Sequence, residues 1–264
     1  MNRPAAPVLA VTDLTVRHPG SVTAADQVSL TVEPGGALVL IGESGSGKTT
    51  VARAVPGLSG PRAEVTGSVR LDGTELRTLG ERALTRIRGR HIGYVPQDPT
   101  GSLDPLRRIG PQLTEVLLRH RVADGRRAAR AAVPPLLERA GIGEPDRVAR
   151  SFPHELSGGL RQRAAIAIAI ACAPRLLIAD EPTTALDAVI RAQILDLFAA
   201  LRADHGIALL MVTHDLAAAR RIGGRAAVMH GGRILETGDA AQVLSRPRHP
   251  HAAELVAAEP GVRP

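Results

Sequence analysis

The chain has 264 residues, of which 44% are apolar and 22% charged, and this composition indicates a folded protein rather than a disordered one. Its net charge of +7 would suit a nucleic-acid or anionic-membrane surface, but the arginines are scattered, and Tyr94, Phe152 and Phe198 are the complete set of aromatic residues for stacking bases. The single cysteine, Cys172, excludes an internal disulfide and a cysteine-based metal cluster, and no apolar run approaches the about 20 residues of a membrane span.

Patterns in the first part of the chain predict several strands with one helix among them. Alternating apolar and polar residues predict antiparallel strands, and the continuous apolar run at 37–41 predicts a fully buried strand. Residues 48–58 predict the helix that follows this strand after a short glycine-rich loop. The predicted strands of this region are residues 8–16, 28–32, 37–41, 65–71 and 92–95.

The composition changes after residue 98, where prolines divide a stretch with a helical pattern. Residues 98–154 are predicted to form an inserted helical lobe, in which 112–120 and 126–140 are the clearest helices. Two apolar runs, 176–179 and 207–212, then predict buried parallel strands, and this alternation indicates the α/β class. The remaining predicted elements are a helix over 189–203, strands at 226–230 and 233–236, a helix near 239–244 and a tail bearing arginine and histidine.

The glycine-rich loop carries the only lysine of the chain, Lys48. Its sequence, GESGSGKT, matches the phosphate-binding pattern G-x-x-x-x-G-K-[ST] and lies between a predicted strand and a predicted helix, as the pattern requires. Backbone N–H groups of the loop attract a triphosphate, the Lys48 ammonium reaches its β- and γ-phosphates, and the Thr49 hydroxyl can bind Mg²⁺. A turn that only joins strand to helix would explain neither side chain, so we predict a nucleoside triphosphatase. The predicted nucleotide-binding residues of this segment are Gly42, Glu43, Ser44, Gly45, Ser46, Gly47, Lys48, Thr49 and Thr50.

Two acids, Asp180 and Glu181, follow the apolar strand at 176–179. Buried strands rarely end in two charged side chains unless these face a cation or a reacting group. Asp180 is predicted to hold the Mg²⁺ shell, and Glu181 to orient or deprotonate the attacking water. Taken alone, the two acids could instead cap the next helix, but their combination with the glycine-rich loop favours catalysis.

Six motifs, in one order along the chain, resemble those of ATP-binding cassette (ABC) ATPases. Besides the glycine-rich loop and the two acids, they are Gln97 after a strand, LSGGLRQ at 156–162, ALD at 185–187 and His214 after another strand. These resemble the Q-loop, signature segment, D-loop and switch histidine of that family. The resemblance implies an α/β P-loop NTPase fold of ABC type, with a RecA-like core, an antiparallel β-subdomain and an inserted α-helical subdomain. It further implies one ABC ATPase domain over 8–258, a helical subdomain at about 98–165 and flexible ends at 1–7 and 259–264.

The resemblance also implies a role for each motif residue. Gln97 would sense Mg²⁺ and the γ-phosphate, which His214 would contact. Ser157 can cap a helix whose free N–H groups form an anion site, and in the family this site closes over the ATP that a second subunit holds. The residues implied in contact with the second subunit's nucleotide are Ser157, Gly158, Gly159, Gln162 and Asp187.

His18 marks a departure from the family pattern. The family usually places an aromatic residue near the end of the first strand to stack on adenine, whereas here no aromatic residue precedes Tyr94, and His18 takes that position. Imidazole offers less stacking area, so we expect weaker contact with adenine and a looser base preference. Two further histidines, His249 and His251, are interpreted as tail residues, with metal binding as the less favoured alternative.

Segments outside the shared motifs resemble the ATPase subunits of oligopeptide, dipeptide and nickel importers. These segments are QDPTGSLDPL at 97–106, PHEL at 153–156 and RPRHP at 246–250. The resemblance implies a peripheral protein at the cytoplasmic face of the cell membrane that binds ATP and Mg²⁺. Its expected partners are a second ATPase subunit, identical or different, two transmembrane permease subunits and, indirectly, an extracytoplasmic solute-binding protein. No nucleic-acid partner is expected.

Two other functions remain open. The ATPase of an ABC exporter shares all the catalytic residues, and some ABC ATPases act on DNA or ribosomes instead of transporting. DNA-repair members separate their nucleotide motifs by long coiled coils, and translation members carry two cassettes, whereas here one compact span joins Gly42 to Asp180. The identity of the solute is not encoded in these motifs, because in the family the solute does not touch this subunit.

Overall fold

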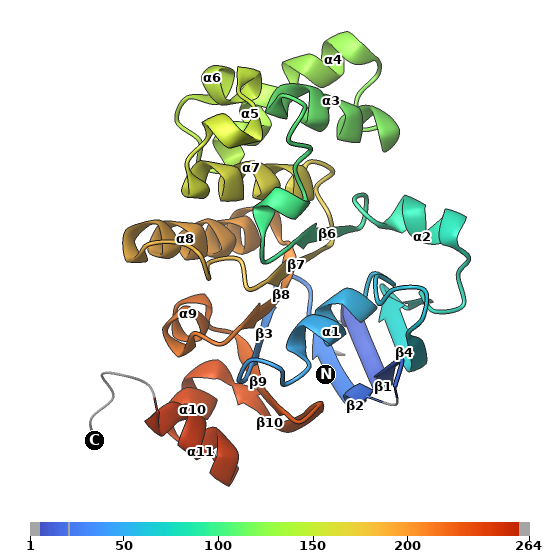
Figure 1. Cartoon of the computed structure of the whole chain (residues 1–264), viewed down its shortest axis with the longest axis vertical. Helices are drawn as coiled ribbons and strands as arrows, with labels where there is room; N and C mark the ends of the chain where they lie inside the picture. Colours follow the sequence, from blue (N-terminus) through green and yellow to red (C-terminus); the bar gives the residue numbers. More distant parts are fainter. Residues whose placement is uncertain (1–5, 21, 259–264) are drawn as a thin grey trace, which may run out of the picture.

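The computed structural model describes residues 6–20 and 22–258. Of the predicted flexible ends, residues 1–5 and 259–264 lie outside the described ranges. The strands are β1 (Leu9–His18), β2 (Val22–Val32), β3 (Ala37–Ile41), β4 (Glu64–Leu71), β5 (Thr74–Glu75), β6 (Ile92–Val95), β7 (Leu176–Asp180), β8 (Ala208–Thr213), β9 (Arg225–His230) and β10 (Arg233–Asp239). In the described ranges they form two sheets, an antiparallel one in the order β2-β1-β4-β5 and a larger one in the order β10-β9-β3-β8-β7-β6 (Figure 1).

In Figure 1, several helices lie against the larger sheet, one short helix lies beside the antiparallel sheet, and others form a separate group at the top. The helices are α1 (Lys48–Ala54), α2 (Glu81–Ile87), α3 (Ile109–Arg119), α4 (Arg126–Ala131), α5 (Val133–Arg139), α6 (Pro145–Arg150), α7 (Gly158–Ile170), α8 (Ala188–His205), α9 (Leu216–Ile222), α10 (Ala240–Ser245) and α11 (Pro250–Ala257). Two short 3₁₀ turns, η1 (Pro99–Gly101) and η2 (Pro153–Glu155), complete the set for the described residues.

The centre of the larger sheet is buried on both faces. Strands β3, β7 and β8 are fully buried along their length, which agrees with their continuous apolar sequences. Leu38 and Leu40 of β3 pack into one core with α1 and the antiparallel sheet, whereas Val39 and Ile41 pack into a second core with α8 and α9. Since β3, β6, β7, β8 and β9 are parallel neighbours, their carboxyl ends meet at one edge of the sheet.

Helices α3 to α6 form a lobe with its own hydrophobic core, visible at the top of Figure 1. Helix α7 joins this lobe to the larger sheet because both of its faces are apolar. Ala164 and Ala167 face the core of the lobe, and Ile166 and Ile170 face the core beneath the sheet. Helix α7 therefore packs the lobe against the larger sheet.

The predicted helices all have somewhat different bounds in the structure, and for two of them proline is the reason. The helix predicted over 126–140 is two helices, separated at Ala132, because prolines in the first turn of α5 lack the N–H groups of a continuous helix. The helix predicted over 48–58 ends at Ala54, and Val55, the residue before Pro56, is its C-cap.

Several short elements were not predicted from the sequence. They are α2, α6, α9, α11, β5 and the first half of β2. In β2 the alternation of apolar and polar residues is broken where Gln27 adopts a left-handed backbone with φ of 50°. Helices as short as α11 gain their stability from packing, here of Leu255 and Val256 against the core beneath the sheet, so the local sequence gives only a weak signal.

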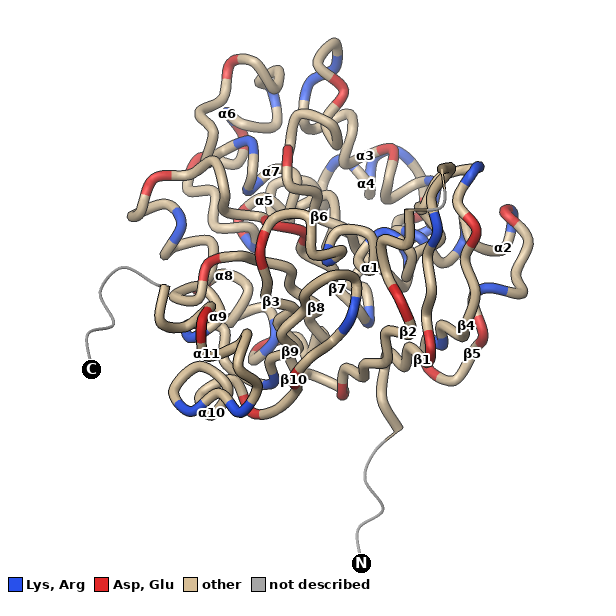
Figure 2. The backbone as a smooth tube through the Cα atoms, turned by 60° about the horizontal axis from the view of Figure 1, so that its bottom comes forward, with Lys and Arg blue, Asp and Glu red and all other residues tan. Residues whose placement is uncertain are grey.

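Charged residues of both signs are interspersed along the chain, and the basic residues are spread over the helical lobe and both sheets (Figure 2). This distribution agrees with the scattered arginines of the sequence. Within residues 6–20 and 22–258, none of the helices has the length and apolar character that crossing a membrane requires.

Candidate functional site

The loop between β3 and α1 can take its path only because two of its residues lack a side chain. A Cβ atom at Gly42 would lie 2.2 Å from the carbonyl oxygen of Met229, and one at Gly47 would lie 2.1 Å from that of Ala24. Gly47 also has a φ of 100°, in the left-handed region that favours glycine. Because these two residues have no Cβ atom, the loop can pack closely against β9 and β2.

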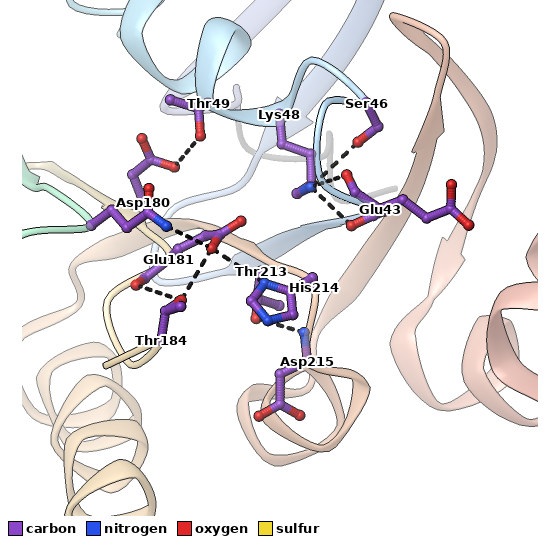
Figure 3. Close-up of polar contacts among 12 residues, drawn as sticks. Glu43, Ser46, Lys48, Thr49, Asp180, Glu181, Thr184, Thr213, His214 and Asp215 are labelled. Carbon is purple, nitrogen blue, oxygen red and sulfur yellow. Dashed lines mark hydrogen bonds and ion pairs between the residues drawn. The ribbon is translucent and has the colours of Figure 1, made fainter. Parts of the chain in front are cut away.

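Lys48 is almost completely buried, with 3% of its surface exposed. Its Nζ donates hydrogen bonds to the carbonyl oxygens of Gly42 at 2.8 Å and Glu43 at 2.6 Å, and to Ser46 Oγ at 3.3 Å (Figure 3). Burial lowers the pKa of the ammonium, against the opposing charges of Glu181 and Asp180. The loop therefore holds a partly desolvated cation that would gain from a further anionic partner.

Asp180, at the end of β7, is 2% exposed and accepts two hydrogen bonds. Thr49 Oγ1 donates to its Oδ1 at 2.9 Å, and the Tyr94 hydroxyl donates to its Oδ2 at 2.8 Å. Burial raises the pKa of Asp180, which these two donors oppose, and the pKa of Tyr94 is raised by burial and by the Asp180 charge. Hydroxyl and carboxylate oxygens in contact are the ligand types that Mg²⁺ prefers, so Thr49 and Asp180 fit such an ion.

Tyr94 was not predicted as a site residue, since its contact with Asp180 arises only when β6 pairs with β7. Replacing Tyr94 by phenylalanine leaves a buried carboxylate oxygen without its donor. We expect the free energy of unfolding, measured by urea denaturation, to fall by about 1–3 kcal/mol. Thr78→Val, which removes an exposed hydroxyl, is the control and should change it by less than about 0.5 kcal/mol. Equal stability of the two variants would contradict this account of Tyr94.

Three side chains meet on one carboxylate oxygen of Glu181. Its Oε2 accepts from Gln97 Nε2 at 3.1 Å. It also accepts from Thr184 Oγ1 at 3.1 Å, and His214 Nδ1 lies 3.2 Å away (Figure 3). The side chain is 11% exposed, and the backbone has a left-handed φ of 46°. Thr184 was not predicted as a site residue. Its position three residues after Glu181 could have indicated the contact, because a turn brings residues at that spacing together.

A cavity of about 630 Å³ connects these groups at the carboxyl edge of the sheet. Its lining combines the glycine-rich loop with the residues around Glu181 and includes Leu255 from α11. The lining residues are Ala24, Gly42, Glu43, Ser44, Gly45, Gly47, Lys48, Thr49, Thr50, Gln97, Glu181, Thr184, His214 and Leu255. The fold therefore brings together the predicted phosphate loop, Gln97, Glu181 and His214, which lie far apart in the sequence.

The other predicted residues lie away from this cavity. Ser157 is the exposed N-cap of α7 and accepts from Leu160 N at 3.3 Å, and Gly158 and Gly159 follow it in the first turn. Asp187 is the N-cap of α8 and accepts from the N–H groups of residues 189 and 190 at 3.0 Å. His18 ends β1 opposite Val22 and is half-buried.

Gln162, unlike Ser157, is buried. It lies on α7 with 2% of its surface exposed, and its Nε2 has no hydrogen-bond partner among the described residues. Helix periodicity places Gln162, unlike Ser157, on the covered side of α7. Contact of Gln162 with the nucleotide of a second subunit stays a prediction.

Comparison with known proteins places this site in a family. The family model for ABC transporters matches residues 25–184. The chain is 47% identical over 257 residues to the oligopeptide transport ATP-binding protein OppD of Mycobacterium bovis, covering 96% of this chain and 42% of that protein. It is 45% identical over 246 residues to a putative peptide import ATP-binding protein of Brucella ovis, covering 90% of this chain and 72% of that protein.

Solved structures agree with the fold. A dimeric structure of the ATP-binding cassette MJ0796 in a post-hydrolysis state with ADP and Pi is similar at a TM-score of 0.78 and 30% identity, over 88% of this chain and 98% of that one. The structure of cbiO1 from Clostridium perfringens has a TM-score of 0.79 at 24% identity, over 92% of each chain, and supports the fold alone.

These matches define a P-loop ATPase cassette, and the chain belongs to the ABC transporter family. The predicted fold class and the resemblance to the oligopeptide-importer branch are both confirmed. The chain spans less than half the length of the first curated relatives that it matches, 42% of OppD from M. bovis and 48% of the peptidoglycan transport ATP-binding protein YejF from Agrobacterium fabrum.

Proposed function

We propose that the chain is the ATP-binding and ATP-hydrolysing subunit of an ABC importer of peptides, nickel or a similar small solute. The observation that carries this proposal is that Lys48, Thr49 and Glu181 line one cavity, where Thr49 also contacts the buried Asp180 at 2.9 Å. The relatives with peptide-transport names support the importer branch over the exporter alternative, which would have the same catalytic residues.

ATP occupies the cavity with its phosphates on the glycine-rich loop. Lys48 turns from the loop carbonyls to the β- and γ-phosphates, which supply the anionic partner that its burial favours. Thr49, Asp180 and Gln97 would hold Mg²⁺, which when bound neutralises phosphate charge. The chemistry of the ligands is the reason for proposing Mg²⁺. The 2.9 Å contact between Thr49 and Asp180 places a hydroxyl and a carboxylate close enough to bind the same ion.

Glu181 orients the attacking water and accepts its proton, while His214 contacts the γ-phosphate. In this conformation Gln97, Thr184 and His214 all hold the same oxygen of Glu181. Binding of the nucleotide draws Gln97 and His214 toward the phosphates, and the carboxylate becomes free to accept a proton. The three contacts thus describe a resting arrangement of the catalytic base.

A second ATPase subunit completes the site. Ser157, Gly158, Gly159 and Asp187 lie away from the chain's own cavity, on exposed helix starts, and they close over the nucleotide of the neighbour in a head-to-tail dimer. The dimeric cassette MJ0796, with ADP and Pi, supports this assembly. The two transmembrane permease subunits contact the helical lobe at the cytoplasmic face of the membrane, and a solute-binding protein delivers the solute.

Reconstitution tests the proposed function. The chain, its partner ATPase and candidate permease subunits are placed in proteoliposomes, and ATP hydrolysis is measured with and without each loaded solute-binding protein. A peptide- or nickel-loaded binding protein is expected to accelerate hydrolysis and drive uptake. Hydrolysis coupled to solute leaving the cytoplasmic side would favour the exporter, and salt-sensitive DNA binding with DNA-stimulated hydrolysis would favour the non-transport class.

His18 provides a test of base selection. With imidazole in the adenine-stacking position, ATP and GTP are expected to be hydrolysed at similar kcat/KM, and His18→Ala to change their ratio little. The measurement is the kcat/KM of each nucleotide for both proteins. A sharp preference for ATP that is lost in His18→Ala would show that histidine stacks as a larger aromatic residue does.

A further inference from the structure

Three metal-ligating side chains meet beside the phosphate loop, away from the Thr49–Asp180 pair. A carboxylate oxygen of Glu43 and one ring nitrogen each of His230 and His251 all lie within 4.8 Å of one another. The three residues come from the loop after β3, from the last residue of β9 and from the first turn of α11. Figure 3 shows the Glu43 side chain extending away from Lys48, so its carboxylate takes no part in the contacts of the ammonium.

The backbone positions of the two histidines are fixed, and their rings are in contact. Their centroids lie 3.8 Å apart with an interplanar angle of 49°. His230 ends a strand that pairs with β3 and β10, while the start of α11 is fixed because Glu236 accepts hydrogen bonds from the backbone N–H groups of Arg248 and His249 at 2.9 Å. The cluster is therefore anchored by the sheet on one side and by a docked helix on the other.

The nitrogens of His251 have distinct surroundings. Nδ1 lies 3.6 Å from a carboxylate oxygen of Glu254, whereas Nε2 is buried and has no hydrogen-bond partner in the part of the chain that the structure describes. A buried polar atom without a partner is costly, and a metal ion would satisfy it. At 3.6 Å the Glu254 carboxylate is not hydrogen-bonded to Nδ1, but a shift of about half an ångström would give it the hydrogen bond that orients metal-ligating histidines.

We propose that Glu43, His230 and His251 bind one Zn²⁺ ion, with a fourth position left for water. Two imidazoles and a carboxylate suit this borderline-soft ion better than Mg²⁺, which prefers oxygen ligands. With metal–ligand bonds of about 2.0–2.2 Å, tetrahedral ligand atoms lie about 3.4 Å apart. The three ligand atoms lie within 4.8 Å of one another, so they need to approach by no more than about 1.4 Å. The exposed side chains of Glu43 and His230 can rotate to do so.

This site would connect the phosphate loop with the C-terminal helix. Leu255 of α11 lines the cavity, and Glu43 is part of the loop, so the ion would tie two walls of the cavity to the end of β9. Zinc binding itself depends on the three side chains and not on the proposed transport function. The test can therefore be made without nucleotide, and its failure would leave that function untouched.

The direct test is calorimetric titration of Zn²⁺ into the full chain, stripped of metal and free of any histidine tag, in excess Mg²⁺. One ion is expected to bind per chain. His251→Phe and His230→Phe keep an aromatic ring in place and remove the ligand, so each should weaken zinc affinity by more than about 100-fold, the upper end of what loss of an outer-shell partner costs. Glu43→Gln should also weaken it. His205→Phe, at an exposed histidine, is the matched control and should bind as the unmodified protein does.

Hydrogen exchange locates the ion. Zinc should slow amide exchange in α11 of the unmodified protein but not of His251→Phe. It should also slow this exchange in Asp180→Asn, because that variant alters the proposed Mg²⁺ site and leaves the three zinc ligands in place. Zinc affinity that is the same in His251→Phe and the unmodified protein, or zinc binding without protection of α11, would overturn the proposal. In the first case the two rings only pack together, and in the second the ion binds elsewhere.

Discussion

Glu181→Gln is expected to lower the rate of ATP hydrolysis by about 10²–10⁴-fold, because the amide cannot accept the proton of the attacking water. The amide oxygen can still accept from Gln97 and Thr184, so the local geometry should persist. ATP affinity should therefore remain, and the variant should accumulate as an ATP-bound dimer. The measurements are phosphate release at saturating ATP and the mass of the complex with and without ATP.

The matched control is Glu138→Gln, which makes the same change at an exposed position on α5. Its hydrolysis rate should equal that of the unmodified protein. If Glu181→Gln hydrolyses ATP at the normal rate, Glu181 is not the catalytic base, and the three contacts on its Oε2 serve only to hold the turn after β7.

Substitution of Lys48 should have the second large effect, on nucleotide affinity. Lys48→Met removes the ammonium from a side chain of similar length, and the lost charge-assisted hydrogen bonds of about 1.5–3 kcal/mol correspond to a roughly 10- to 150-fold weaker ATP affinity. Lys48→Arg keeps the charge, but the planar guanidinium has to fit where only 3% of the lysine is exposed. Both variants are expected to bind ATP weakly in a fluorescent-nucleotide displacement assay.

The comparison of these two variants separates charge from shape. Arg139→Met removes a positive charge from an exposed site at the end of α5 and should leave ATP affinity unchanged. Affinity in Lys48→Arg equal to that of the unmodified protein would show that the site requires a cation and not the slender shape of lysine. Each variant should first show cooperative unfolding, so that a folding defect is not mistaken for a binding defect.

Much of the fold could be predicted from local patterns. The apolar run of β3, the glycine-rich loop and α1 follow one another within a few residues, and the bounds of β3 and β6 match the prediction. Predictions failed where local signals were weak, as at the start of β2 and at α11, and where prolines had greater effect than helical periodicity, as between α4 and α5. The limits of 8–258 for the domain and of about 98–165 for the helical subdomain stay predictions.

The sequence by itself determined which side chains carry the chemistry: the lysine and threonine of the loop, the two acids after β7, and the order of the motifs. Only the tertiary structure decided which of them meet. Thr49 and Asp180 are 131 positions apart, and they touch because parallel strands end at one edge of the sheet. The Tyr94 contact, the meeting of Gln97 and His214 at Glu181, and the Glu43–His230–His251 cluster have the same origin, because strand pairing and the docking of α11 join segments that no local pattern relates.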